Sequence, residues 1–241
     1  IPIHFNVIGD VFALKKAASL AKIDKGYENI VSFTNLNLSN KKYSIKPSRY
    51  GGEISYRSII KSINLFKEKK ICALVTSPIS KESLHLAGKK FDGHTGLLGF
   101  FLKKSNPLMA LSTKKVLTVH VSTHLSLLNA IKQVKKARIL EAIELSCNHL
   151  KMLGIKNPSI GVCGLNPHAG ENGIFGEEEI SEIIPAINQA KEKGFNVKGP
   201  ISGDIIFRDA LRGVYQIVIA QYHDQGHIPI KLLSFDSAIN V

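Results

Sequence analysis

The sequence predicts an α/β protein with mainly parallel strands. Short apolar runs of strand length alternate along the chain with segments whose apolar residues recur at helical spacing. Polar clusters that contain histidine follow several of these runs, and the ends of strands in open α/β sheets are where ligands bind. With 241 residues, the chain can form one large domain or two small ones with real cores.

The expected strands are short apolar runs bounded by Gly, Pro or polar residues. They cover residues 4–8, 71–75, 116–121, 159–165 and 214–220, with a further candidate at 228–233. The expected helices cover residues 12–21, 53–66, a short segment ended by Gly88, 128–153 and 177–194. Pro185 is expected to kink the last of these helices, because proline removes a backbone donor. Residues 32–50 are polar and irregular and predict a long loop or a partly extended excursion.

The net charge of +13 could serve nucleic acid, an anionic membrane or a phosphorylated substrate. The lysines are spread along helix-like segments and no nucleic-acid motif is visible, which favours a solvated basic surface. A basic nucleic-acid-binding domain remains an alternative, and it would bind DNA or RNA with a steep salt dependence. No apolar run approaches the ~20 residues that cross a bilayer, so no membrane partner is expected.

Three cysteines far apart, with no CxxC motif, favour a reduced, cytoplasmic compartment. Cys72 and Cys163 lie in apolar runs and are expected in the core. The first residues lack the basic region and cleavage site of a signal peptide, and they also lack an initiator Met. The true start of the protein is therefore expected to lie outside this sequence.

Three histidines sit in short segments that predict a site: His124 in 123–125, His168 in 166–171 and His223 in 222–226. Three neutral imidazoles from three loops could hold one divalent metal and leave positions open for a substrate. Asp224 could orient one of the imidazoles. His124 taken alone could equally follow a simple helix N-cap. The remaining histidines of the expected elements are interpreted as structural (His85, His120 and His149) or as a surface residue (His227).

Other polar segments are less specific. His94 and Thr95 lie between glycines in a loop that suits a phosphate or carboxylate, although an ordinary Asp-Gly turn explains the pattern too. Asp204 stands in a Gly/Pro turn, where a carboxylate is commonly turn chemistry. Lys231 lies in an apolar run, where it would be either a buried base or an exposed edge-strand residue. The sequence contains no GxGxxG or Walker A loop.

Taken together, these segments resemble the 4-hydroxythreonine-4-phosphate dehydrogenase family of vitamin B6 biosynthesis. The matching segments occur in the family's order at residues 76–81, 93–95, 123–125, 164–171, 199–204 and 222–226. The resemblance implies a two-lobed α/β/α subunit, similar to isocitrate and isopropylmalate dehydrogenases, with the active site in the cleft between the lobes. We expect two interleaved lobes split approximately into residues 1–100 and 101–241.

The resemblance also implies a reaction. It is the metal-dependent, NAD-linked oxidation of 4-phosphohydroxy-L-threonine to a 3-keto acid, which loses carbon dioxide to give 3-amino-2-oxopropyl phosphate. A divalent metal (zinc, magnesium, cobalt or manganese) would be ligated by His124, His168 and His223, at a site shared between the subunits of a homodimer. The residues that match substrate-binding or catalytic positions are His94, Thr95, Asn240, Asp204 and Lys231, of which the last two would be catalytic. NAD or NADP would bind without a GxGxxG loop, through residues that the resemblance does not assign.

The chain departs from the family pattern at both ends and in one loop. The Gly/Pro-rich segment expected before the first helix is absent, and the chain stops at residue 241 where family members continue, so we expect a longer natural protein. Gly96 stands where an acidic residue is common, which bears on substrate selectivity. The same chemistry on a phosphorylated four-carbon sugar acid therefore remains a rival. A metal-storage or structural role is a third alternative, but it leaves the 93–95 loop without a purpose.

Overall fold

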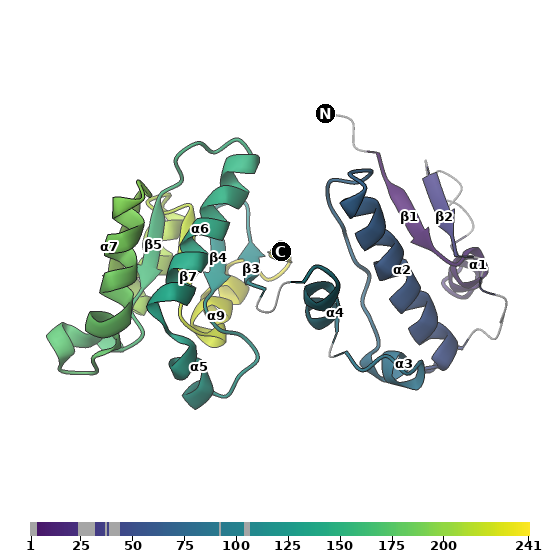
Figure 1. Cartoon of the computed structure of the whole chain (residues 1–241), viewed down its shortest axis with the longest axis horizontal. Coiled ribbons are helices and arrows are strands. Elements are labelled where there is room, and N and C mark those ends of the chain that lie inside the picture. The colour runs from purple at the N-terminus through teal and green to yellow at the C-terminus, as the bar shows by residue number, and fades with distance from the viewer. Residues whose placement is uncertain (1–3, 24–31, 37, 39–43, 92, 104–106) are drawn as a thin grey trace. The chain divides into compact units, whose positions relative to one another are not determined.

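The computed structural model describes residues 4–23, 32–36, 38, 44–91, 93–103 and 107–241. The chain divides into two compact units, Ile1–Pro107 and Leu108–Val241 (Figure 1). Each unit contains both helices and strands, so the α/β class expected from the sequence is confirmed. No helix among the described residues has the length and apolar character needed to span a membrane.

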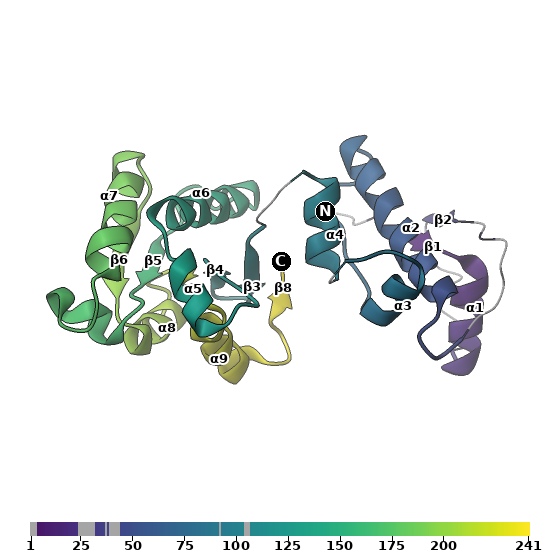
Figure 2. The same ribbon diagram turned by 60° about the horizontal axis from the view of Figure 1, so that its bottom comes forward.

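The first unit contains two parallel strands and four helices within its described residues. The strands are β1 (Asn6–Gly9) and β2 (Ser32–Asn35), and the helices are α1 (Val11–Leu20), α2 (Arg49–Lys67), α3 (Lys81–Leu86) and α4 (His94–Phe101). Figures 1 and 2 both show α2 lying beside the strand pair. Ile59 and Ile63 share one face of α2, as their spacing predicts, and pack against the buried Leu97 of α4.

A buried carboxylate joins three parts of this unit. Asp10 is 5% exposed and caps α1 by accepting a hydrogen bond from the N–H of Ala13 at 3.1 Å. It also accepts one from the N–H of Leu38 at 3.3 Å and one from the hydroxyl of Tyr50 at 2.9 Å. Burial acts to raise the pKa of Asp10, but the bonds from Ala13 and Tyr50 outweigh it, so the pKa lies below its usual range. Burial and the neighbouring carboxylate raise the pKa of Tyr50 to about 12.

Replacing Tyr50 with phenylalanine is expected to lower the free energy of unfolding by about 2 kcal/mol at neutral pH, because a hydrogen bond to a charged group is lost. A depressed carboxyl pKa contributes stability above its unfolded pKa, and this contribution disappears as pH falls through the folded pKa. The difference between wild type and variant should therefore stay constant from pH 7 to about pH 4 and shrink as the pH falls further. Urea unfolding from pH 7 to below about pH 4 measures it, and a difference that stays constant below about pH 4 would contradict an ionised Asp10 as the partner.

The second unit is a six-stranded sheet covered by helices on both faces. The strand order is β6-β5-β7-β4-β3-β8, in which β4 to β7 run parallel and β3 and β8 complete one edge antiparallel to their neighbours. The strands are β3 (Met109–Ser112), β4 (Leu117–His120), β5 (Ile160–Cys163), β6 (Val197–Ile201), β7 (Ile217–Ala220) and β8 (Ile239–Asn240). The helical segments are α5 (Leu127–Gln133), α6 (Lys136–Met152), the 3-10 turn η2 (Pro167–Gly173), the π-helical η3 (Glu179–Ile183), α7 (Ile184–Glu192), α8 (Gly203–Leu211) and α9 (His223–Ser234).

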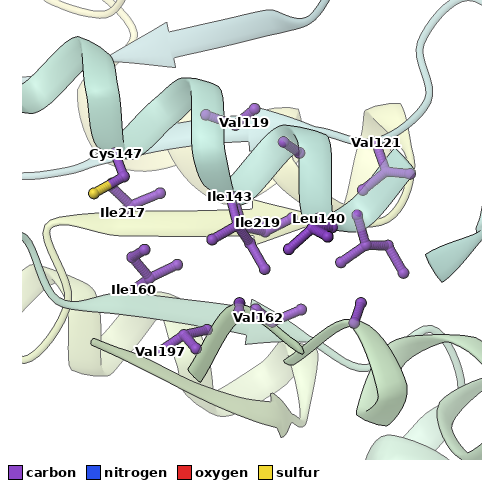
Figure 3. Close-up of a cluster of buried hydrophobic side chains, with 14 of the residues drawn as sticks. Val119, Val121, Leu140, Ile143, Cys147, Ile160, Val162, Val197, Ile217 and Ile219 are labelled. Atoms are coloured by element: carbon purple, nitrogen blue, oxygen red, sulfur yellow. The ribbon is translucent and has the colours of Figure 1, made fainter. Parts of the chain in front are cut away.

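Alternation along the strands divides the core into two layers. Ile217 and Ile219 of β7 face the cluster formed with α6 and α7, and Figure 3 shows Ile143 of α6 near Ile219 and Cys147 of α6 near Ile217. Val218, between them, faces the cluster formed with α8 and α9. Because both faces of β7 are covered, the strand appears in the sequence as an unbroken apolar run.

One predicted strand of the first unit is wrong. Residues 71–75 form no strand, and Leu74 and Val75 are 37% and 90% exposed. Cys72, expected in the core, is exposed as well. Among the described residues of this unit, only β1 and β2 pair into a sheet, so the run has no neighbouring strand to bury it. The excursion expected over residues 32–50 also contains a strand, β2.

Two further expectations differ in the second unit. The strand considered at 228–233 is part of α9, where Gly226 and Ile230 share the buried face, because such a short, largely apolar run fits either structure. The helix expected over 128–153 is interrupted at Val134 and Lys135, whose backbone is not helical. The helix expected over 177–194 changes from the π-helical η3 to α7 just before Pro185, which stands in the first turn of α7.

Candidate active site

Two of the predicted histidines meet at the carboxyl ends of neighbouring parallel strands. His124 follows β4 and His223 follows β7, and their ring centroids are 5.5 Å apart. Both line a cavity of about 260 Å³, together with Ser122, Thr123, Tyr222 and Asp224 among others. The pairing of β4 with β7 places the residues that follow these strands at one edge of the sheet, which is the usual position of a ligand site in such folds.

The ring of His223 is tied on one side. Its Nδ1 lies 2.7 Å from a carboxylate oxygen of Asp224, so Nδ1–H donates and Nε2 carries the lone pair in the neutral ring. The side chain of Gln225 connects the strand ends near this ring. It donates to the carbonyl of Gly164 at 2.7 Å and accepts from the N–H of Gln221 at 2.7 Å. These bonds link the start of α9 to the ends of β5 and β7.

Two further histidines extend this cluster into the core. His120, at the end of β4, is 1% exposed, and its Nδ1 lies 3.1 Å from the carbonyl of Met109. Its Nε2 lies 3.1 Å from Nδ1 of His227, whose ring stacks on that of His223 with centroids 3.7 Å apart and planes inclined by 10°. Burial lowers the pKa of His120 to about 4, so this ring is neutral near physiological pH.

The third predicted histidine, His168, stands in a left-handed turn. Five consecutive residues of η2, His168 to Asn172, have positive φ, including 50° at His168 and 42° at Glu171. Side chains other than glycine seldom adopt this region, so the surroundings must hold the turn. His168 is exposed, and its ring centroid lies 6.2 Å from that of Phe175.

The side chain that holds this turn is Glu179, which is 2% exposed. Its carboxylate accepts hydrogen bonds from the backbone N–H of Leu165 at 2.7 Å and of Asn166 at 2.8 Å. It also accepts one from the side-chain amide of Asn166 at 2.8 Å. The turn closes tightly over this carboxylate, because a Cβ added at Gly170 would lie 2.7 Å from Glu179 Oε2. A buried acid from η3 thus shapes the loop that carries His168.

The other predicted residues of the second unit are exposed. Asp204 lies in the first turn of α8, and a hydrogen bond from the Ser202 hydroxyl lowers its pKa, with a smaller effect from nearby His168. Lys231 lies on α9, where the structure contradicts burial in an apolar strand: its Nζ is 4.9 Å from the ring centroid of Phe235. The helical turn carries Lys231 away from the face that buries Ile230. Asn240 pairs with Leu111 at the sheet edge.

His94 and Thr95 belong to the first unit. They are the first two residues of α4, and Gly93 precedes them with a φ of 127°, a conformation that suits glycine. The structure therefore replaces the expected free loop by a helix start. Backbone N–H groups at such a start have no partner within the helix.

The three predicted metal ligands do not come together within one chain. Across the described residues, no three His, Cys, Asp or Glu side chains are placed to hold a metal ion, so His168 does not join His124 and His223. The two adjacent imidazoles and the Nε2 lone pair of His223 are a donor set that fits a divalent metal, but an incomplete one.

Sequence reasoning missed two features. His227 was interpreted as a surface histidine, but it is half-buried against His120 and His223. Its spacing of four from His223 was the available signal, because residues i and i+4 of a helix share a face. Glu179 was missed because nothing in the run Glu177-Glu178-Glu179 distinguishes the one that is buried.

Comparison with known proteins gives the family. Residues 3–241 match the family described as pyridoxal phosphate biosynthetic protein PdxA. The D-threonate 4-phosphate dehydrogenases of Cupriavidus necator and Salmonella typhimurium are each 41% identical to this chain over 81% of its length. The chain spans 59% and 60% of the length of these two relatives.

A solved structure agrees with this assignment. The crystal structure of a 4-hydroxythreonine-4-phosphate dehydrogenase from Burkholderia phymatum has 35% sequence identity and a TM-score of 0.87 to this protein. The match covers 98% of this chain and 76% of that chain. The resemblance stated from the sequence motifs is therefore confirmed. The chain belongs to the pyridoxal phosphate biosynthetic protein PdxA family, which includes dehydrogenases named for phosphorylated substrates.

Proposed function

We propose that the protein is a metal-dependent, NAD-linked dehydrogenase that oxidises a hydroxyl group of a phosphorylated four-carbon acid. The observation that carries this proposal is the pair His124 and His223, which lie at the ends of two parallel strands beside a cavity. Family membership supports the dehydrogenase class. Oxidation at C3 gives a 3-keto acid, and a 3-keto acid loses carbon dioxide readily.

The metal would be held by His124, His168 and His223. Because the described residues of one chain bring only the first and last of these together, we propose that a second copy of the chain completes the site in a homodimer. When bound, a divalent metal such as zinc, magnesium, cobalt or manganese would polarise the substrate hydroxyl, and NAD or NADP would accept the hydride.

The remaining predicted residues have proposed roles toward substrate and protons. His94 and Thr95 would bind the substrate from the start of α4, together with Asn240 and Lys231 of the second unit. The exposed amine of Lys231 and the carboxylate of Asp204 would handle the protons that leave the hydroxyl and return to carbon. A location in the cytoplasm fits three cysteines without a disulfide.

Two substrates share this chemistry and differ only at C2. D-threonate 4-phosphate has a hydroxyl there and would yield dihydroxyacetone phosphate after decarboxylation. 4-Phosphohydroxy-L-threonine has an amino group there and would yield 3-amino-2-oxopropyl phosphate. The relatives at 41% identity named for D-threonate 4-phosphate favour the first acid, and the structure at 35% identity named for 4-hydroxythreonine 4-phosphate supports the second.

The proposal is tested by measuring NADH formation with each of the two acids as substrate, with and without added divalent metal. We expect metal-dependent turnover, faster with D-threonate 4-phosphate, and a loss of more than about 100-fold in His168→Ala, because partners beyond the ligands already cost about 10–100-fold. Leu128→Ala, an exposed residue of α5, is the matched control and should keep its activity. Turnover that needs no metal, or that survives His168→Ala, would overturn the metal site. Turnover on neither acid would overturn the substrate class.

A further inference from the structure

The hydrogen bonds of His120 and His227 fix which ring nitrogen of each carries the hydrogen. The carbonyl of Met109 can only accept, so His120 Nδ1 carries the hydrogen and donates at 3.1 Å. Its Nε2 then has a lone pair, which must accept from Nδ1–H of His227, also at 3.1 Å. The same Nδ1 of His227 lies 3.2 Å from the carbonyl of His223, a second acceptor. In each of these bonds, therefore, it is settled which atom donates and which accepts: Nδ1–H of each ring donates, and the two carbonyls and His120 Nε2 accept.

The chain of bonds holds the ring of His227 in one plane. The backbone of α9 packs closely on His120, because a Cβ added at Gly226 would lie 2.4 Å from its Nε2 and 2.9 Å from Thr118 Cγ2. His227 is thus anchored at Nδ1 by a ring that is itself fixed in the sheet. The face of His227 is presented to His223, parallel to within 10°.

We propose that the buried His120 and the half-buried His227 are positioning residues that set the ring plane of His223 so that its Nε2 is available toward His124. This inference rests on the proposed role of His223 as a metal ligand. Asp224 fixes the rotation of the His223 ring at Nδ1, and stacking on His227 fixes its tilt. The two contacts restrict different motions. A hydrogen bond at one ring atom still allows the ring plane to tilt about that atom, and the stacked ring of His227 restricts this tilt.

Three substitutions at His227 distinguish the contribution of its stacking face from that of its Nδ1–H donor. His227→Phe keeps a flat face against His223 but removes the donor to His120. His227→Asn places an amide donor near the position of Nδ1 but removes the face. His227→Leu removes both. All three leave Asp224 in place, and both His227→Phe and His227→Leu leave His120 Nε2 unpaired, so a loss of stability alone would affect these two alike.

Cobalt titration of the metal-free, full chain measures the consequence through the visible absorption of the bound ion. We expect His227→Phe, which keeps the stacking face but loses the bond that anchors it to His120, to bind cobalt more weakly than wild type and more tightly than His227→Leu. His227→Leu and His227→Asn should bind about tenfold more weakly, in the range found for partners that orient a metal ligand. Equal affinity in wild type and His227→Leu would overturn the inference, as would a loss in His227→Phe equal to that in His227→Leu.

Nitrogen-15 NMR of the histidine rings in the metal-free protein tests the pair without any metal. Both His120 and His227 should show the Nδ1–H form, because Nδ1 of each ring faces a backbone carbonyl. The Nε2–H form at either residue would overturn the inference. If these forms are found and wild type binds no cobalt, the positioning pair stands and the metal part of the proposed function fails.

Discussion

Replacing Glu179 with alanine is expected to lower the free energy of unfolding of the second unit by about 3 kcal/mol or more, because three hydrogen bonds lose their acceptor. The backbone N–H groups of Leu165 and Asn166 would be left without a partner in a part-buried place. The left-handed turn that follows would lose the group that holds it, so His168 would also sample other positions. Urea unfolding followed by circular dichroism measures the stability.

Glu179→Gln is the matched control for this prediction. Its amide oxygen can still accept from the two backbone N–H groups, whereas its NH₂ group would face the Asn166 amide, which now donates at 2.8 Å. We expect a loss of about 1 kcal/mol, close to one ordinary hydrogen bond. If Glu179→Ala and Glu179→Gln each lowered the free energy of unfolding by the same small amount, the carboxylate would not be holding the turn.

Replacing Gly226 with alanine is expected to destabilise the second unit by about 2 kcal/mol, although alanine favours helix by about 1 kcal/mol over glycine. The new Cβ would lie 2.4 Å from His120 Nε2 and 2.9 Å from Thr118 Cγ2, both on the buried strand β4. Neither group can withdraw, because the sheet has helices on its other face. Either α9 lifts from the sheet or the bond between His120 and His227 breaks.

Gly96→Ala provides the opposite case in the same experiment. Gly96 lies inside α4, is exposed, and has no atom within 4 Å of an added Cβ. This substitution should therefore stabilise its helix by up to about 1 kcal/mol. Thermal or urea unfolding of both variants measures whether the free energy of unfolding falls for Gly226→Ala and rises for Gly96→Ala. A stabilising Gly226→Ala would show that α9 does not pack closely on β4.

The central sheet and the histidines at its edge could be predicted from the sequence because both are local signals. The runs that become β5 and β7 are apolar on both faces, whereas β4 has Thr118 and His120 on one face, and polar residues follow each run within three positions. The segment 228–233 could not be assigned in this way, because its apolar residues fit a strand or one face of a helix until the position of β4 is known.

Contacts between residues far apart in the chain could not be predicted from the sequence, for a different reason. The contact between His120 and His227 joins residues 107 positions apart, and only the packing of α9 on β4 creates it. The positive φ values at Ala169 and Glu171 have no side-chain signature, since neither residue type favours that region. They follow from the acceptor that Glu179 provides from a separate turn.

The three cysteines of the chain differ in accessibility, and this difference has a practical use. Burial raises the pKa of the Cys147 thiol, and it does so strongly for Cys163, so both are poor nucleophiles in the folded protein. Cys72 is exposed, in the unit Ile1–Pro107. A maleimide dye would consequently attach at one place per chain without any engineering. This chain thus has one accessible thiol to which a fluorophore or spin label can be attached, and from which distances to the histidine cluster of the other unit can be measured.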